Sequence, residues 1–312
     1  MPSDRKVSPK GVARGKRKAA PEPKPKVKAA PKVKRKAKVK AAPKAKRKPT
    51  SKRRSQVRPE PFSDADAKSI VVLGSTSAMA RATAGEFAAR GYNILLAARD
   101  QEENRTIAAD IQVRFGVETA ALPFEAEDFG SHEAFFTECR RILGDSIEGV
   151  ILCFGYMADQ TDAQADFAKV HRMVDVCYTG AVSILEIVAR HFEERKRGFI
   201  AVLSSVAGDR GKQGNYLYGS AKGGLTVYLE GLRNRLFHAG VHVTTIKPGF
   251  VDTKMTFGLP GLFLVASPDK AGKAICKAIL KRKNTAYVPF FWQYIMLLIR
   301  HIPEWQFKKM RM

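Results

Sequence analysis

The run Val72-Leu73-Gly74-Ser75-Thr76-Ser77-Ala78-Met79-Ala80-Arg81 joins a short apolar segment to the start of a helical pattern. Gly74 permits a tight turn after the apolar segment, and the small Ala78 and Ala80 let a ligand approach the backbone at a helix N-terminus. Such a turn is typical of loops that hold phosphate groups. The pattern GxxxAxA is poorer in glycine than the usual dinucleotide-binding loop, so by itself it also fits an ordinary strand-to-helix connection.

Near-continuous apolar runs alternate with longer amphipathic stretches over the rest of the chain. This alternation predicts a single doubly wound α/β (Rossmann) domain, a parallel sheet with helices on both faces and ligands outside the carboxyl ends of the strands. The strands are expected at Ile70–Leu73, Asn93–Ala97, Val117–Leu122, Gly149–Phe154, Phe199–Leu203 and Val241–Ile246, and the helices near residues 79–90, 101–115, 131–143, 164–195 and 216–239.

Charge divides the chain into two parts. Residues 1–60 hold 24 lysines and arginines and 3 acidic residues, a net charge of +21 out of +25 for the whole chain. Like-charge repulsion and recurrent proline prevent a packed core, so residues 1–66 are predicted to form a disordered basic tail. Its role stays open between attraction to an anionic membrane surface, sequence-independent binding of nucleic acid, and a solvated extension without a partner. It lacks the features of a secretory signal or a transit peptide.

The cysteines and histidines show no metal-binding spacing. The cysteines stand singly in apolar or helical contexts, which predicts reduced thiols in a cytoplasmic protein; they are Cys139, Cys153, Cys177 and Cys276. His171, His238 and His242 have no further ligands at useful spacing, so no metal site is expected.

Tyr218 and Lys222 stand four residues apart in the run Tyr-Gly-Ser-Ala-Lys and would share one face of a helix. A phenol with a pKa near ~10 is a poor acid or base at neutral pH unless a cation beside it favours the phenolate, and Lys222 would supply that cation. Ser205, at the exit of an apolar run, would hold a carbonyl or alcohol oxygen against the tyrosine hydroxyl. This spacing also occurs as surface decoration on helices, but the serine and the glycine turn favour an oxidoreductase site.

The end of the second expected strand bears on the choice of dinucleotide. An acid at the strand tip would bind a ribose 2′-hydroxyl, whereas an arginine accommodates a 2′-phosphate. Arg99 precedes Asp100 there, so NADP(H) is favoured over NAD(H), although Arg99 also fits a solvated loop charge. Glu125, after the third strand, is expected to bind the adenine amine.

From about residue 68 onward the chain resembles the short-chain dehydrogenases/reductases. The resemblance rests on the Gly74 loop and on the runs 203–208, 218–222 and 247–253. It implies that Ser205 and Tyr218 contact the substrate oxygen, that Tyr218 transfers the proton, and that Lys222 lowers the tyrosine pKa and binds the nicotinamide ribose. It also implies a homo-oligomer, and cofactor contacts from Gly74, Ser75, Thr76, Ala78, Ala80, Gly155, Tyr218, Lys222, Pro248, Gly249, Val251 and Thr253.

Within that family the chain resembles the decaprenylphosphoryl-2-keto-erythro-pentose reductases. The similar stretches are Cys153-Phe154-Gly155, the Tyr-Gly-Ser-Ala-Lys form, Val288-Pro289-Phe290 and the run 300–303. This resemblance implies NADPH-dependent reduction of a 2-keto sugar linked to polyprenyl phosphate.

Cys177 departs from the family pattern. It stands where the family usually has an asparagine that completes a proton relay with the lysine, and a thiol is a weak donor and acceptor. Cysteine also packs simply as a small apolar residue. A rerouted or lost relay would suit a different kind of protein, a catalytically weak NADP(H)-binding scaffold or sensor that acts through the basic tail on nucleic acid or membrane.

Residues 67–285 are expected to form the catalytic domain and residues 286–312 a separate segment. The run 286–299 contains 14 residues without formal charge, fewer than the ~20 that cross a bilayer. Basic and aromatic residues follow it, including Arg300 and Trp305, which suits an element lying on the inner face of a membrane. The same pattern fits a helix packed on the catalytic domain or in a dimer interface.

Overall fold

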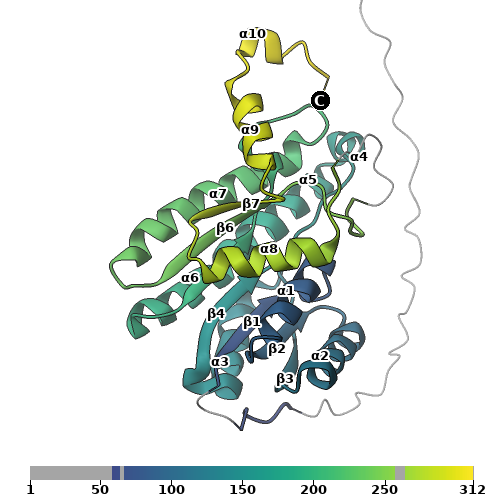
Figure 1. Cartoon of the computed structure of the whole chain (residues 1–312). Helices are drawn as coiled ribbons and strands as arrows, with labels where there is room; N and C mark the ends of the chain where they lie inside the picture. Colours follow the sequence, from purple (N-terminus) through teal and green to yellow (C-terminus); the bar gives the residue numbers. More distant parts are fainter. Residues whose placement is uncertain (1–57, 64–66, 257–263, 312) are drawn as a thin grey trace, which may run out of the picture. The chain divides into compact units, whose positions relative to one another are not determined.

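The computed structural model describes residues 58–63, 67–256 and 264–311. Its centre is a parallel sheet in the order β3-β2-β1-β4-β5-β6-β7 (Figure 1). The seven strands are β1 (Ser69–Leu73), β2 (Asn93–Ala98), β3 (Thr119–Pro123), β4 (Ile147–Leu152), β5 (Phe199–Leu203), β6 (His242–Pro248) and β7 (Thr285–Val288). The order reverses between β1 and β4, as the doubly wound fold requires, so the predicted fold class is confirmed.

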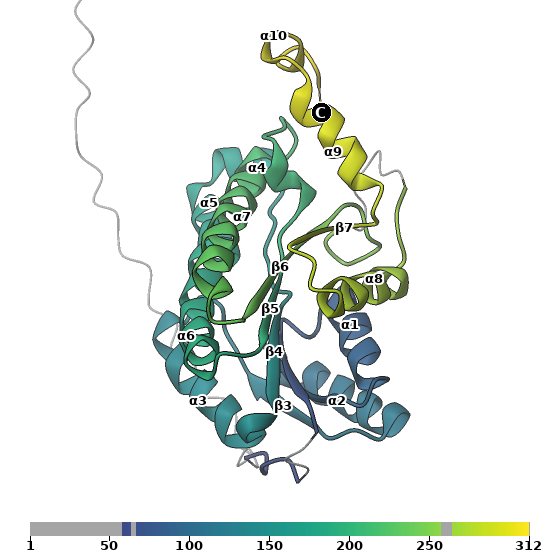
Figure 2. The same ribbon diagram turned by 60° about the vertical axis from the view of Figure 1, so that its left-hand side comes forward.

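Helices cover both faces of this sheet, and Figure 2 shows the two layers on either side of it. One layer contains α1 (Ala78–Ala88), α2 (Gln101–Phe115) and α8 (Pro268–Leu280), and the other contains α3 (His132–Leu143), α6 (Gly180–Arg195) and α7 (Tyr216–Phe237). The side chains of β1 alternate between the layers, and all of them are fully buried. The remaining elements are α4 (Gln160–Ala165), α5 (Phe167–Val174), α9 (Trp292–His301), α10 (Glu304–Phe307), a π-helical turn η3 (Asp175–Thr179), and the short 3-10 helices η1 (Phe129–Ser131), η2 (Gly144–Ser146) and η4 (Val206–Asp209).

The expected bounds hold for β5 and α2 and shift by a few residues in most other elements. The long helix expected over 164–195 is instead divided into α4, α5, η3 and α6. Asp166 has an extended backbone between α4 and α5, and its side chain accepts a hydrogen bond from the Ala168 amide (3.0 Å), so it caps a new helix. The pair α8 and β7 was not predicted.

The ordered domain extends beyond both expected boundaries. Residues 58–63 are held by hydrogen bonds, among them Arg58 Nε to Glu138 Oε1 (2.7 Å) and the Phe62 amide to the Ile142 carbonyl (2.9 Å). The boundary expected between residues 285 and 286 falls inside β7, where Ala286 pairs with Ile246 of β6. The other residues of the predicted tail, 1–57 and 64–66, lie outside the described residues, and so do the predictions of their disorder and of their membrane or nucleic-acid binding.

The C-terminal helices continue from the end of β7, and both views show α9 and α10 projecting past it (Figures 1 and 2). Within the described ranges, no helix is long and apolar enough to span a membrane.

Candidate active site

Close packing of α7 against η4 brings the predicted catalytic residues together. A Cβ on Gly219 would lie 2.7 Å from the Ala207 carbonyl oxygen, so only glycine allows this approach. Ser205, at the end of β5, caps η4 by accepting a hydrogen bond from the Ala207 amide (3.0 Å). Tyr218 and Lys222 are buried on α7, and the Lys222 Nζ atom lies 6.0 Å from the centre of the Tyr218 ring.

The protonation of Tyr218 differs from the sequence-based expectation. Its pKa is raised rather than lowered, because burial and the neighbouring Cys177 thiol outweigh a side-chain hydrogen bond with Ser205. The Lys222 ammonium donates instead to the Leu203 carbonyl (2.9 Å), and burial lowers the pKa of this lysine. Tyr218 is therefore protonated at neutral pH, the state that a proton donor needs.

Cys177 lies in the π-helical turn and holds the loop after β4. Its Sγ atom accepts from the Tyr156 amide (3.3 Å) and donates to the Tyr156 carbonyl (3.2 Å). These contacts fix the adjacent Gly155, where a Cβ would lie 3.5 Å from Lys222 Nζ and 3.8 Å from Cys177 Sγ. The thiol thus positions the backbone beside the buried lysine. All four cysteines are buried and unpaired by disulfides, as predicted.

The Gly74 turn lies close against the loop after β4. Gly74 has φ +79°, and a Cβ there would meet the Phe154 amide nitrogen at 2.6 Å. Ser77, the N-cap of α1, forms no side-chain capping hydrogen bond within the described chain, and the first turn of α1 carries no acidic residue. The N-terminus of α1, next to Thr76 and Ala78, thus has no carboxylate in its first turn, a setting that suits an anion. Ala80 is instead fully buried in the core.

Ser75, by contrast, has a structural position. It is fully buried, and its hydroxyl donates to Asn104 Oδ1 (2.6 Å). Asn104 in turn donates to the Leu96 carbonyl (3.1 Å). This asparagine was not predicted, and its position on an otherwise buried face of α2 was its signal in the sequence.

At the end of β2, Arg99 and Asp100 differ in what they contact. Asp100 caps α2 by accepting from the amides of Glu102 (3.1 Å) and Glu103 (3.0 Å). Arg99 is exposed at the strand tip. The Asp100 carboxylate therefore binds the N-terminus of α2. Arg99 is the exposed charged side chain at the end of β2, and β2 pairs with β1, the strand that leads into the Gly74 turn.

The turn after β6 is covered by α9. A Cβ on Gly249 would lie 2.0 Å from Trp292 Nε1, so this turn and the tryptophan pack without space between them. Val251 is buried in the core, whereas Thr253 lies in a turn in which its amide donates to Thr256 Oγ1 (3.1 Å). Pro248 ends β6.

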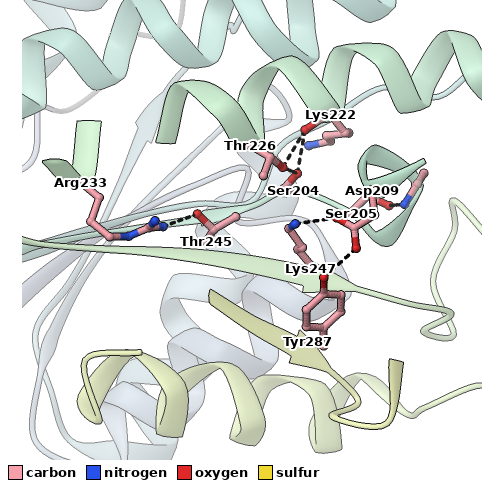
Figure 3. A network of polar contacts seen from close by, with 10 residues as sticks. Ser204, Ser205, Asp209, Lys222, Thr226, Arg233, Thr245, Lys247 and Tyr287 are labelled. Carbon is pink, nitrogen blue, oxygen red and sulfur yellow. Dashed lines mark hydrogen bonds and ion pairs between the residues drawn. The ribbon is translucent and has the colours of Figure 1, made fainter. Parts of the chain in front are cut away.

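A buried polar network behind Ser205 was not predicted (Figure 3). The Lys247 ammonium lies 2.5 Å from Asp209 Oδ1, and the Tyr287 hydroxyl donates to Asp209 Oδ2 (2.7 Å). The lysine and aspartate side chains are only 8% and 2% exposed. This network joins η4 to β6 and β7, and a lysine at the end of an apolar strand was its signal in the sequence.

Arg210, which follows Asp209 in the chain, connects the end of η4 to the C-terminal helices. Its guanidinium donates to the carbonyls of Ile299 (2.6 Å) and Ile302 (2.7 Å), pairs with Glu304 (2.9 Å), and lies 3.6 Å from the centre of the Phe307 ring. Asp209 at the end of η4 and the adjacent Arg210 therefore anchor both β7 and the segment after it.

His132 holds the loop that carries Glu125. Its Nε2 atom lies 3.1 Å from the Glu125 carbonyl oxygen. Because a carbonyl oxygen can only accept, Nε2 carries the hydrogen and donates it. In the neutral ring Nδ1 then accepts from the Ser183 hydroxyl (2.9 Å). The Glu125 carboxylate itself lies near the Glu127 amide (3.5 Å). This role of His132 was not predicted.

Because His132 is buried, we expect the free energy of unfolding to decrease in acid. Burial lowers the pKa of His132, so below its unfolded pKa of ~6.5 the unfolded chain binds a proton that the folded chain does not. The free energy of unfolding should fall by up to ~1.4 kcal/mol per pH unit from this group as the pH drops below ~6.5. Urea unfolding of wild type and His132→Gln at several pH values measures the slope, which should be shallower in the variant. An equal slope would contradict the account, and the exposed His238→Gln is the control.

Among the described residues, no group of three or more histidine, cysteine or acidic side chains is placed to hold a metal ion.

Comparison with known proteins identifies the family. The family model for short chain dehydrogenases matches residues 68–259. The chain belongs to the short-chain dehydrogenase/reductase family. An uncharacterized oxidoreductase of Mycobacterium tuberculosis is 30% identical over 247 residues, covering 79% of this chain and 98% of that protein. An uncharacterized oxidoreductase of Streptomyces coelicolor is 31% identical over 246 residues, covering 78% of this chain and 96% of that protein.

The fold is likewise that of this family. A short-chain dehydrogenase from Sphingobium yanoikuyae, solved in complex with NADPH, superposes with a TM-score of 0.63 at 21% identity, covering 76% of this chain and 97% of that one. The protein is therefore an NAD(P)-dependent oxidoreductase of the short-chain family.

Proposed function

We propose that the protein is an NADPH-dependent carbonyl reductase that acts on a ketone linked to a polyprenyl phosphate, a 2-keto sugar in the first instance. The observation that carries the reductase part is a protonated, buried Tyr218 beside Ser205, with the Lys222 ammonium and Gly155 next to it. These are the groups that ketone reduction needs, a proton donor and a second polar contact for the oxygen.

A bound reduced nicotinamide would supply the hydride that goes to the carbonyl carbon. Tyr218 would donate its proton to the oxygen as negative charge develops there, and the Ser205 hydroxyl would orient that oxygen. The Lys222 ammonium would favour the phenolate left on Tyr218 as the proton leaves. The backbone at Gly74 and the α1 N-terminus would hold the dinucleotide phosphates, with Gly155 and the turn at Gly249 at the reacting end.

The preference for NADPH is proposed to depend on Arg99, since Asp100 is committed to capping α2. A charged hydrogen-bonding contact contributes about 1.5–3 kcal/mol, so Arg99→Ala should raise the KM for NADPH roughly 10- to 100-fold with little change for NADH. Steady-state kinetics with both cofactors measures the ratio. Arg105→Ala, on the following helix, is the control, and an equal effect on both cofactors would contradict the role.

The lipid-linked substrate is supported by the resemblance of the Cys153–Gly155 and C-terminal stretches to the keto-pentose reductases and by the apolar residues of the C-terminal helices. We propose that the protein works as a homo-oligomer at the cytoplasmic side of a membrane. The test compares NADPH oxidation on a polyprenyl-phosphate 2-keto pentose and on the same sugar phosphate without the lipid. Preference for the lipid form by at least about tenfold is expected. NADPH binding without turnover on any ketone would favour the scaffold instead.

A further inference from the structure

Helix α9 has one face buried and one face exposed. The buried side chains Trp292 and Met296 pack on Val206, the residue after Ser205. On the other side Tyr294, Leu297 and Leu298 of α9 share a helical spacing, and Phe290 lies in the turn before the helix. These four side chains are 54% to 73% exposed. We call these four residues the apolar ridge. Exposed apolar side chains are ordinary when they stand singly, but a continuous row of them marks an interaction surface.

The chain around the ridge is basic. Residues 264–311 contain 10 lysines and arginines and only two acids, Asp269 and Glu304, for a net charge of +8, whereas residues 61–263 have a net charge of −4. A groove between α8 and the start of α9 is lined by Phe290 together with the lysines Lys270, Lys277 and Lys281. Apolar and cationic side chains therefore face the same space.

Apolar side chains beside a basic surface favour one kind of partner over another. A two-fold contact between copies of the chain would bring the same basic patch against itself, which like charges oppose. An anionic bilayer supplies the opposite charge, and each lysine or arginine close to such a surface contributes favourably. Tyr294 and the 65%-exposed Trp305 are the residue types found at the headgroup level of membranes.

We propose that the apolar ridge and the lysines of α8 form a docking surface for an anionic lipid bilayer, on which α9 lies in the plane of the headgroups. Because Arg210 binds the end of α9 and Met296 packs on Val206, docking holds the Ser205 loop close to the lipid surface. The inference concerns binding alone and does not depend on the proposed reaction.

The test uses the full chain and vesicles of phosphatidylglycerol containing brominated lipid. The chain has two tryptophans, and Trp305 is the exposed one, so bromine quenching of its fluorescence reports insertion of the C-terminal helices and not binding through residues 1–57. High salt, near ~1 M, screens purely electrostatic attraction to a Debye length of about 3 Å. Wild type should remain bound and quenched in high salt.

The variant Leu297→Glu/Leu298→Glu should lose the quenching and bind at least roughly tenfold more weakly in high salt. Val113→Glu/Phe237→Glu changes the charge equally at exposed apolar positions of α2 and α7 and should behave as wild type. Unchanged thermal unfolding verifies that both variants fold. Quenching that survives in the ridge variant, or no quenching in wild type, would overturn the proposal. So would an oligomer that the ridge variant dissociates, since a second copy would then occupy the ridge.

Discussion

Tyr218→Phe is expected to lower kcat by about 10²- to 10⁴-fold, the usual contribution of a positioned proton donor. Phenylalanine keeps the ring in its buried place on α7 but lacks the hydroxyl group. That hydroxyl is protonated at neutral pH in the wild type because its pKa is raised. Cofactor affinity should change little, because the loss falls on the chemical step. Single-turnover reduction measured with saturating NADPH separates that step from binding and product release.

Tyr216→Phe is the matched control for this experiment. Tyr216 lies two residues earlier on the same helix, but it is exposed, and its hydroxyl accepts from the Gln164 side chain (3.2 Å). Its removal should leave kcat within about twofold, as expected for an exposed neutral contact. A Tyr218→Phe enzyme that retained more than about a tenth of the wild-type kcat would contradict the assignment of the proton donor.

Lys247→Met should cost about 3–5 kcal/mol of unfolding free energy, because it leaves the Asp209 carboxylate buried without its cation. The ion pair is nearly inaccessible to water. Within the part of the chain that the structure describes, the Tyr287 hydroxyl would still donate to the carboxylate. Urea denaturation measures the loss. Since Ser205 is the N-cap of η4, kcat should fall as well.

Two further variants test whether the pair itself carries this effect. Tyr287→Phe removes one hydrogen bond and should cost about 0.5–1.5 kcal/mol. Lys247→Met combined with Asp209→Leu replaces the pair by apolar groups and should recover most of the stability lost in the single variant. If Lys247→Met costs less than about 1 kcal/mol, the network does not hold η4 in the way described.

Local sequence patterns predicted the features that depend on local geometry. The i, i+4 spacing placed Tyr218 and Lys222 on α7, and the glycine after an apolar strand predicted the tight turn at Gly74. The binding of phosphate at that turn remains a prediction. The apolar runs gave six of the seven strands, because buried parallel strands need continuous apolar residues. The fold class followed from their alternation with helices.

Features that depend on contacts between distant residues were not predictable in this way. Strand β7 is short and its place in the sheet depends on β6, so the sequence suggested a separate C-terminal segment where the structure has an edge strand. The expected lowering of the Tyr218 pKa was wrong because desolvation follows from the packing of α7 on η4, which no local pattern encodes. The network of Asp209, Lys247 and Tyr287 joins three elements and is visible only once they are folded.

The most direct test of the central claim is the stoichiometry of NADPH oxidation by the purified full-length protein with a polyprenyl-phosphate 2-keto pentose. The account predicts one NADPH oxidised per ketone reduced by wild type and by Tyr216→Phe, and loss of this turnover in Tyr218→Phe. NADPH oxidation that proceeds equally in Tyr218→Phe, or none in wild type with lipid-linked and small ketones alike, would contradict it.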